Sequence, residues 1–170
     1  MHTTIFLPFH IRRVNCTAKD QRMNKLLFLC HGNICRSPMA EFVMKDLVKK
    51  AGRENEFIID SAAVSNEEFG NPIYPPARRK MNEHNIPFDD HRAHRVTPTE
   101  FDRYDLVIVM DQSNLNILGR IVGRDKLDKV RMLMSYTGNA RDVADPWYSG
   151  DFERAYQDIV AGCKALLETL

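Results

Sequence analysis

Several features that define particular protein classes are scarce or absent in this sequence. No apolar run approaches the roughly 18 residues that a transmembrane helix needs. Charges of the two signs balance, with 24 Lys and Arg against 23 Asp and Glu, so bulk charge favours neither a nucleic acid nor a membrane as partner. The 4 cysteines form no regular disulfide framework. We therefore expect a soluble, cytoplasmic protein with no nucleic-acid and no membrane partner.

Length and composition indicate one folded domain. A chain of 170 residues with 44% hydrophobic content can bury a single core, and no repeat or linker divides it. Residues 1–22 fit this picture poorly. Their apolar run at 5–11 is too short for a signal-peptide core, is broken by Pro8 and has no basic residue before it. We expect residues 1–22 to be a mobile N-terminal extension and residues 23–170 to form the functional domain.

Apolar strands alternate with helical patterns along the chain. Strands are predicted at 25–29, 57–62, 105–110 and 130–134, and the main helices at 39–52, 75–84, around 115–121 and from 151 onward. This alternation predicts an α/β fold, a single three-layer domain with a four-stranded parallel sheet flanked by helices. Ligands of such sheets bind beyond the carboxyl ends of the strands, which is where Cys30, Ser61, Asp111 and Asp145 fall.

The stretch 30–38, Cys-His-Gly-Asn-Ile-Cys-Arg-Ser-Pro, joins the first predicted strand to the first predicted helix. Ser37 suits the N-cap, and Pro38 suits the first helical position, where a missing N–H group has no consequence. A tight loop before a helix start gathers backbone N–H groups, and the helix dipole favours an anion there. We therefore expect a phosphate-binding loop after the first strand.

Residue types within this loop suit chemistry at phosphorus. A helix N-terminus and a nearby cation favour the thiolate form of a cysteine such as Cys30, which is the nucleophilic form. The planar guanidinium of Arg36 can hold two phosphoryl oxygens at once. Gly32 allows close backbone approach, Asn33 tolerates a left-handed conformation, and Ser37 can turn its hydroxyl toward the sulfur. The pattern predicts that Cys30 forms a covalent phospho-enzyme while Arg36 binds the phosphoryl group.

The longer run Cys-His-Gly-Asn-Ile-Cys-Arg-Ser-Pro-Met-Ala-Glu resembles the signature of the low-molecular-weight protein tyrosine phosphatases, and the likeness covers about residues 25–170. It implies hydrolysis of phosphotyrosine and small aryl phosphate monoesters, with no metal and no organic cofactor. The implied partners are a phosphotyrosyl protein and phosphate or other oxyanions, and we expect a monomer or weak homodimer. The loop residues that the resemblance places around the phosphoryl group are His31, Gly32, Asn33, Ile34, Cys35 and Ser37.

The reaction also needs an acid to protonate the leaving oxygen. Asp145 precedes Pro146, Trp147 and Tyr148, and Pro146 restricts Asp145 to an extended backbone. From the residues alone, an Asp-Pro pair is more typical of a plain turn. The resemblance implies instead that Asp145 is the general acid and then the general base, with Trp147 and Tyr148 as walls of the pocket.

Further matches to the family concern residues outside the loop. They imply that Ser61 and His84 brace the loop and that Asp111 lies near the site, where it could equally be the N-cap of the following helix. A buried structural histidine is the alternative for His84. His91 and His94 fall in a charged segment that we expect to be exposed, and no further residue completes a metal-ligand set with them.

One departure from the family concerns the loop after the second strand. Many members have an aromatic residue there, whereas this chain has Glu67 and Glu68, followed by Phe69. We expect Glu67 to contribute to substrate binding. Two carboxylates at a pocket rim repel acidic phosphopeptides, so they favour basic or small substrates. A solvated loop face is the alternative.

Cys35 stands five positions after the nucleophile in the same loop. The resemblance implies a reversible disulfide between Cys35 and Cys30, which protects the nucleophile from higher oxidation. The alternative is a small buried packing residue.

Three other functions remain open. An arsenate reductase of this fold has an additional downstream cysteine pair, but only Cys163 follows Cys35. A phosphoarginine phosphatase tends to have Thr where this chain has Ile34. A non-catalytic phosphate-binding module is disfavoured because both Cys30 and Asp145 are present.

Overall fold

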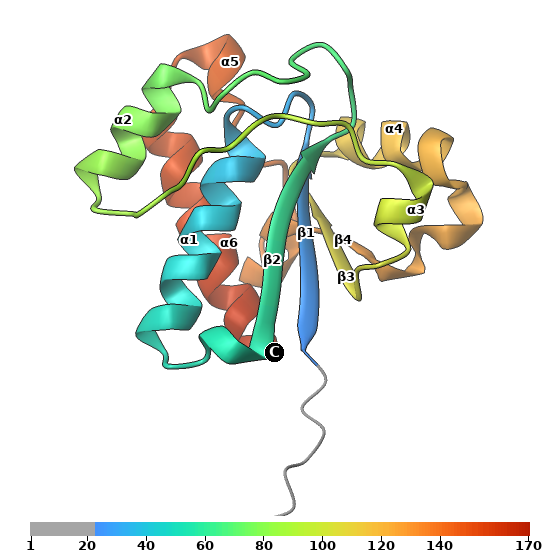
Figure 1. The fold of residues 1–170 in the computed structure, drawn as a ribbon, viewed down its shortest axis with the longest axis horizontal. Helices are drawn as coiled ribbons and strands as arrows, with labels where there is room; N and C mark the ends of the chain where they lie inside the picture. Colours follow the sequence, from blue (N-terminus) through green and yellow to red (C-terminus); the bar gives the residue numbers. More distant parts are fainter. Residues whose placement is uncertain (1–22) are drawn as a thin grey trace, which may run out of the picture.

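The computed structural model describes residues 23–170, so the expected N-terminal extension, residues 1–22, lies outside the described part. Four parallel strands form one sheet in the order β2-β1-β3-β4 (Figure 1). These strands are β1 (Asn24–Cys30), β2 (Phe57–Ala63), β3 (Leu106–Val109) and β4 (Val130–Met132). The predicted four-stranded parallel sheet is confirmed.

Helices cover both faces of the sheet (Figure 1). One side carries α1 (Arg36–Lys50), α2 (Pro75–Glu83) and α6 (Phe152–Thr169). The other side carries α3 (Pro98–Phe101) and α4 (Gln112–Val122). The remaining elements are short: η1 (Glu54–Glu56), η2 (Arg124–Lys129), η3 (Leu133–Thr137) and α5 (Pro146–Ser149). The three-layer architecture is therefore as predicted.

β1 is the central strand of the core. Its side chains alternate between two buried clusters, with Leu26 and Phe28 on the α1 and α6 side and Leu27 and Leu29 on the α3 and α4 side. Because both faces are covered, β1 is apolar and buried from Leu26 to its end rather than alternating with polar residues. The strand ends at Cys30, which lies opposite Ala63 of β2.

The start of α1 differs from the prediction. The helix begins at Arg36, so Ser37 lies inside it and Pro38 is its third residue. Cys35 occupies the N-cap position and makes no side-chain capping bond. The Ser37 hydroxyl instead faces the Cys30 sulfur, with 3.1 Å between Oγ and Sγ. The local sequence predicts that the Ser37 hydroxyl caps the helix, but in the structure this hydroxyl contacts Cys30 across the loop.

Other helix starts follow the expected chemistry. Thr97 Oγ1 accepts a bond from the Glu100 N–H group at 3.1 Å and so caps α3. The last helix, predicted from 151 onward, begins at Phe152, and Asp151 is its N-cap. The last strand is shorter than predicted, because Leu133 and Met134 belong to η3.

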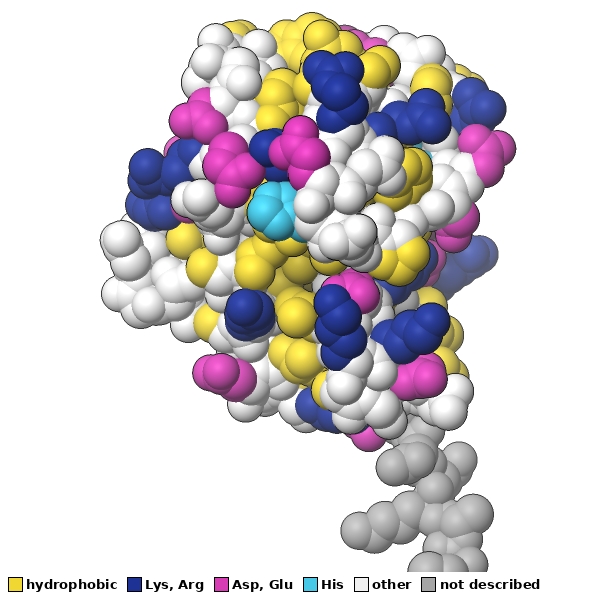
Figure 2. All heavy atoms as spheres, turned by 90° about the vertical axis from the view of Figure 1, so that its left-hand side faces the viewer, with side chains coloured by type: hydrophobic (Ala, Val, Ile, Leu, Met, Phe, Trp, Pro, Cys, Tyr) yellow, Lys and Arg dark blue, Asp and Glu magenta, His cyan; other side chains and the backbone are white. Residues whose placement is uncertain are grey.

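The face seen in Figure 2 carries charges of both signs. Lys and Arg side chains are interspersed with Asp and Glu side chains over this view.

Within residues 23–170, no helix combines the length and the apolar character that crossing a membrane requires.

Candidate active site

The nucleophile candidate lies where β1 ends and the loop begins. Cys30 Sγ accepts a hydrogen bond from the Asn33 N–H group at 3.3 Å and contacts Ser37 Oγ at 3.1 Å. The sulfur is thus held at the mouth of the loop by one backbone group and one hydroxyl. The predicted approach of Ser37 to Cys30 is thus present in the structure.

Arg36 is buried between two carboxylates from distant segments. Its Nη1 donates to Asp111 Oδ2 and its Nη2 to Asp145 Oδ2, both at 2.7 Å. Burial alone lowers the pKa of this guanidinium, but the neighbouring Cys30, Asp145 and Asp111 raise it above its ordinary value. Arg36 is therefore a permanently charged group held at a defined position beside Cys30.

Asp111 combines the two roles that the sequence left open. Its Oδ1 accepts a bond from the Asn114 N–H group at 2.7 Å and so caps α4. Its Oδ2 receives Arg36 at the same time. The cap orients the carboxylate, and the carboxylate then orients the guanidinium.

Asn33 is the structural centre of the loop. Its backbone has a φ of 58°, in the left-handed region that asparagine tolerates. The side-chain Nδ2 donates to Ser37 Oγ and to Ser61 Oγ, each at 2.9 Å. Ser61 in turn donates to Glu41 Oε2 at 2.6 Å. The loop is thereby tied to β2 and α1, and Ser61 lies where a bracing residue is expected.

Two histidines contact this loop that sequence reasoning did not select. The His91 side chain is only 8% exposed, and its Nε2 lies 2.9 Å from the carbonyl oxygen of Asn33, to which it donates. The backbone N–H of His94 donates to Asn33 Oδ1 at 3.3 Å. The expected exposure of this segment is wrong for His91. No spacing pattern marks the segment, so only its charged composition was visible in the sequence.

His84 lies elsewhere than the resemblance implied. It ends α2, where its ring stacks on Tyr156 with 4.0 Å between the ring centroids. Its Nε2 lies 3.5 Å from Glu153 Oε2. The bracing role expected of His84 is therefore not seen at that residue, and His91 contacts the loop backbone instead, because the segment after α2 turns back across the loop.

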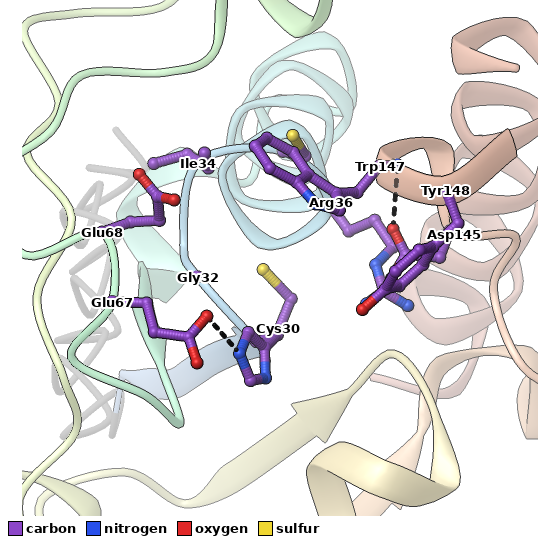
Figure 3. A pocket seen from close by; sticks show the side chains of 11 residues that line it. Cys30, Gly32, Ile34, Arg36, Glu67, Glu68, Asp145, Trp147 and Tyr148 are labelled. Atoms are coloured by element: carbon purple, nitrogen blue, oxygen red, sulfur yellow. Dashed lines mark hydrogen bonds and ion pairs between the residues drawn. The ribbon is translucent and has the colours of Figure 1, made fainter. Parts of the chain in front are cut away.

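A pocket of about 110 Å³ opens above Cys30 (Figure 3). Glu67 and Glu68 lie on one side of it, and Trp147, Tyr148 and Asp145 lie on the other side. All loop residues expected around the phosphoryl group line this pocket except Asn33 and Ser37, which lie beneath it. The lining loop residues are Cys30, His31, Gly32, Ile34, Cys35 and Arg36.

The rim of the pocket is held by local contacts. His31 Nε2 lies 3.0 Å from Glu67 Oε2, and Asn71 donates to Glu68 Oε2 at 2.7 Å. A Cβ atom on Gly32 would lie 3.0 Å from Glu68 Cγ, so a larger residue at Gly32 would press on this rim. Both glutamates line the pocket, and each has one carboxylate oxygen engaged by a neighbouring side chain.

Asp145 occupies the opposite wall. Its backbone is extended, with φ −93° and ψ 105°, as predicted for a residue before proline. Oδ1 accepts the Trp147 N–H group at 3.1 Å, so Asp145 also caps the short helix α5. Trp147 and Tyr148 are more than half exposed beside it, which leaves their rings available to a bound group.

Cys35 and Cys163 are both buried thiols. Burial raises the pKa of Cys35, and the negative charges at Cys30, Asp145 and Glu68 raise it further. Burial likewise raises the pKa of Cys163, whose Sγ packs 3.8 Å from the Ala40 carbonyl oxygen. Among the residues described, 23–170, no group of three or more His, Cys, Asp or Glu side chains is arranged to hold a metal ion.

Comparisons with known proteins agree with this geometry. The family profile described as "Low molecular weight phosphotyrosine protein phosphatase" matches residues 25–170. Low molecular weight protein-tyrosine-phosphatase YfkJ of Bacillus subtilis is 36% identical over 150 residues, which span 87% of this chain and 96% of YfkJ. The human low molecular weight phosphotyrosine protein phosphatase is 38% identical over 154 residues, 88% of this chain and 97% of that protein.

Solved structures show the same fold. The crystal structure of YfkJ has a TM-score of 0.84 and covers 86% of this chain and 94% of its own. The drosophila arginine phosphatase DARP has a TM-score of 0.78 at 29% identity, covering 85% of this chain and 96% of its own. With the cysteine, arginine and aspartate meeting in one pocket, the chain belongs to the low molecular weight phosphotyrosine protein phosphatase family.

Proposed function

We propose that this protein hydrolyses phosphotyrosine in protein substrates through a phospho-cysteine intermediate, with Cys30, Arg36 and Asp145 as its catalytic residues. The observation that carries the proposal is their convergence on one pocket at the carboxyl end of β1. The loop residues His31 to Cys35 surround the phosphoryl group, and Asn33, Ser37 and Ser61 support that loop through their hydrogen bonds.

The first half of the reaction forms a sulfur–phosphorus bond. Arg36 and the loop N–H groups bind the phosphoryl oxygens while the Cys30 thiolate attacks phosphorus. The bond between phosphorus and the phenolic oxygen breaks, and Asp145 gives its proton to that oxygen. The products of this step are a neutral phenol, the phospho-cysteine and an ionised Asp145.

The second half restores the enzyme. The Asp145 carboxylate takes a proton from a water molecule that attacks phosphorus, and the phosphorus–sulfur bond breaks. Inorganic phosphate leaves, Cys30 becomes a thiolate again, and Asp145 is protonated for the next cycle. A phosphoryl dianion in the pocket competes with Asp145 for Arg36, to which Asp145 Oδ2 is hydrogen-bonded in the free protein.

The pocket walls support an aryl substrate. Trp147 and Tyr148 offer aromatic faces at the mouth, and Ile34 adds an apolar wall. The likeness to an arginine phosphatase makes phosphoarginine the second candidate substrate class. A direct comparison of phosphotyrosyl and phosphoarginyl peptides separates the two, and faster release of phosphate from the arginine peptide would overturn the tyrosine assignment.

Hydrolysis of para-nitrophenyl phosphate tests the catalytic residues. We expect turnover by the wild type in the presence of a chelator, no turnover by Cys30→Ser, and a loss of about 10²–10⁴-fold in Asp145→Ala, which is the usual contribution of a general acid or base. Arsenate serves as the control for reductase activity. A folded, reduced wild type without turnover would favour a phosphate-binding module instead.

The acidic rim predicts a charge preference. Glu67 and Glu68 line the pocket at its rim. We expect the residues beside a phosphotyrosine to pass this rim, so lysine-flanked peptides should react faster than glutamate-flanked peptides. An exposed charge pair contributes about 0.2–1 kcal/mol, which is roughly a 1.5- to 5-fold change in kcat/KM for each carboxylate. Glu67→Gln and Glu68→Gln should each reduce the ratio of kcat/KM for lysine-flanked peptides to kcat/KM for glutamate-flanked peptides. Glu54→Gln is the control, since Glu54 lies in η1 at the start of β2. An unchanged ratio in both rim variants contradicts the preference.

A further inference from the structure

The segment 141–145, which carries Asp145, is anchored to α6 through the buried carboxylate of Asp158. Arg141 Nη1 donates to Asp158 Oδ2 at 2.8 Å and Nη2 donates to Asp158 Oδ1 at 2.6 Å. The backbone N–H of Ala144 donates to the same Oδ2 at 3.1 Å. Asp158 therefore holds the segment at two points, one of which is the residue directly before Asp145.

The opposite side of this segment is attached to the sheet. The Val143 N–H group donates to the Met110 carbonyl at 2.9 Å, so the segment is hydrogen-bonded to the residue that directly follows β3. Asp142 Oδ1 accepts the Gln112 N–H group at 3.1 Å, at the start of α4. The segment thus lies between β3 and α6, and Asp158 supplies the anchor on the α6 side.

Asp158 is charged, although it is only 4% exposed. Burial alone raises its pKa, but the hydrogen bonds from Arg141 and Ala144, with the charges of Arg141 and Arg154, lower it below the ordinary value. A buried charge is costly unless it is paired and hydrogen-bonded. Most of the groups that satisfy Asp158 belong to the segment that bears the general acid rather than to α6 itself.

We propose that Asp158 and Arg141 are positioning residues for the general acid, because they hold the backbone before Asp145 at the distance that proton transfer to the leaving oxygen requires. The proposal rests on the acid role of Asp145 proposed above. Reacting groups must be placed to within a fraction of an ångström, and a displacement of about 1 Å can reduce a rate by about 10²-fold. Asp158 touches neither substrate nor the reacting atoms and acts through Asp145 alone.

The leaving group of the substrate distinguishes positioning from a merely structural ion pair. Phenyl phosphate has a poor leaving group and depends on the acid, whereas 2,4-dinitrophenyl phosphate has a good leaving group that departs without a proton. The value of kcat/KM reports the step up to formation of the phospho-cysteine. A loss of kcat/KM that is confined to phenyl phosphate therefore indicates impaired protonation of the leaving oxygen. An equal loss of kcat/KM on both esters indicates general damage to the site.

We expect Arg141→Ala and Asp158→Asn in the full chain to reduce kcat/KM for phenyl phosphate by about 10-fold or more, and for the dinitrophenyl ester by less than about 2-fold. Arg154→Ala is the matched control. Arg154 Nε lies 3.4 Å from the same Asp158 Oδ1 but belongs to α6 itself, so its loss should leave the ratio of the two esters unchanged. The proposal would be overturned if kcat/KM fell equally for both esters. It would also be overturned if the ratio of the two kcat/KM values in Arg141→Ala were the same as in wild type.

Two further variants keep the outcome interpretable. Asp145→Ala must itself show the selective loss on phenyl phosphate. If it does not, the acid role fails, whereas a selective loss in Asp145→Ala but not in Arg141→Ala refutes the positioning role alone. If Arg141→Ala fails to fold in circular dichroism, Arg141→Lys replaces it. Lysine keeps the charge but cannot make the paired bonds, so the selective loss should persist, and a wild-type ratio would refute the proposal.

Discussion

The backbone of Asn33 shows how one residue supports the whole loop from Cys30 to Arg36. Its left-handed conformation turns the chain so that the N–H group of Asn33 faces Cys30 Sγ. The side chain then satisfies groups from the helix, from β2 and from the segment that bears His94. These contacts are buried, so each polar group that loses its partner would carry a desolvation cost.

Asn33→Ala should therefore destabilise the protein more than the backbone conformation alone explains. Alanine in a left-handed conformation costs about 1–2 kcal/mol, and three lost side-chain bonds cost about 1 kcal/mol each, for a total of about 4–5 kcal/mol in the free energy of unfolding. Asn85→Ala is the matched control, because Asn85 has a φ of 56° but is exposed. Urea unfolding measures both variants, and equal losses would show that the side-chain network contributes nothing.

At the scale of elements, α6 couples the core to the segment that bears Asp145. The helix packs on α1 and on η3, and its Asp158 anchors the segment that leads to Asp145. Close approach between α6 and η3 is possible because Gly162 has no side chain. A Cβ atom at Gly162 would lie only 2.5 Å from Leu133 Cγ.

Gly162→Ala should consequently lower the free energy of unfolding by about 1–3 kcal/mol, the usual cost of overpacking a core. Gly119→Ala in α4 is the comparison. Its Cβ atom would meet Leu127 Cδ1 at 3.3 Å, and alanine gains up to about 1 kcal/mol in helix propensity, so the net change should be under about 1 kcal/mol. Chemical denaturation of both variants tests this, and a neutral Gly162→Ala would contradict the tight α6–η3 packing.

The stability of the whole molecule should respond to pH through His94. The hydrogen bond from His94 to Glu100 Oε1, at 2.8 Å, is the main cause that raises the pKa of His94 above its ordinary value of 6.5. Burial opposes this shift, while the charge of Glu100 and a backbone bond to Arg92 add to it. A raised pKa in the folded state means that the folded protein holds the proton more tightly than the unfolded chain.

The resulting stabilisation is fully present below pH 6.5 and is lost as the pH rises through the raised pKa of the folded state. His94→Gln should lack this component. The difference in unfolding free energy between wild type and His94→Gln should therefore be largest in mildly acidic buffer and should shrink toward alkaline pH. Glu100→Gln removes the partner and should give the same trend. A difference that is constant with pH would show that this pair does not titrate with folding.

Local sequence was sufficient to predict the strands, most helix starts and the loop from Cys30 to Arg36. Such features depend on residues a few positions apart, through side-chain periodicity, capping and backbone preference. Even there, the cap assigned to Ser37 was wrong, because the hydroxyl contacts Cys30 across the loop. The family resemblance located Asp145 and Asp111, which local patterns alone interpret as a turn and a cap.

The sequence by itself thus determined the parallel sheet, the loop that joins β1 to α1 and the residue types proposed for phosphoryl transfer. Tertiary structure decided which groups meet. Arg36 pairs with Asp145 across 109 positions, His91 rather than His84 reaches Asn33 across 58, and Asp158 anchors Arg141 across 17. No periodic pattern encodes such contacts. They arise when the packing of α1 and α6 against the sheet brings the carboxyl ends of the strands and the connecting segments to one edge.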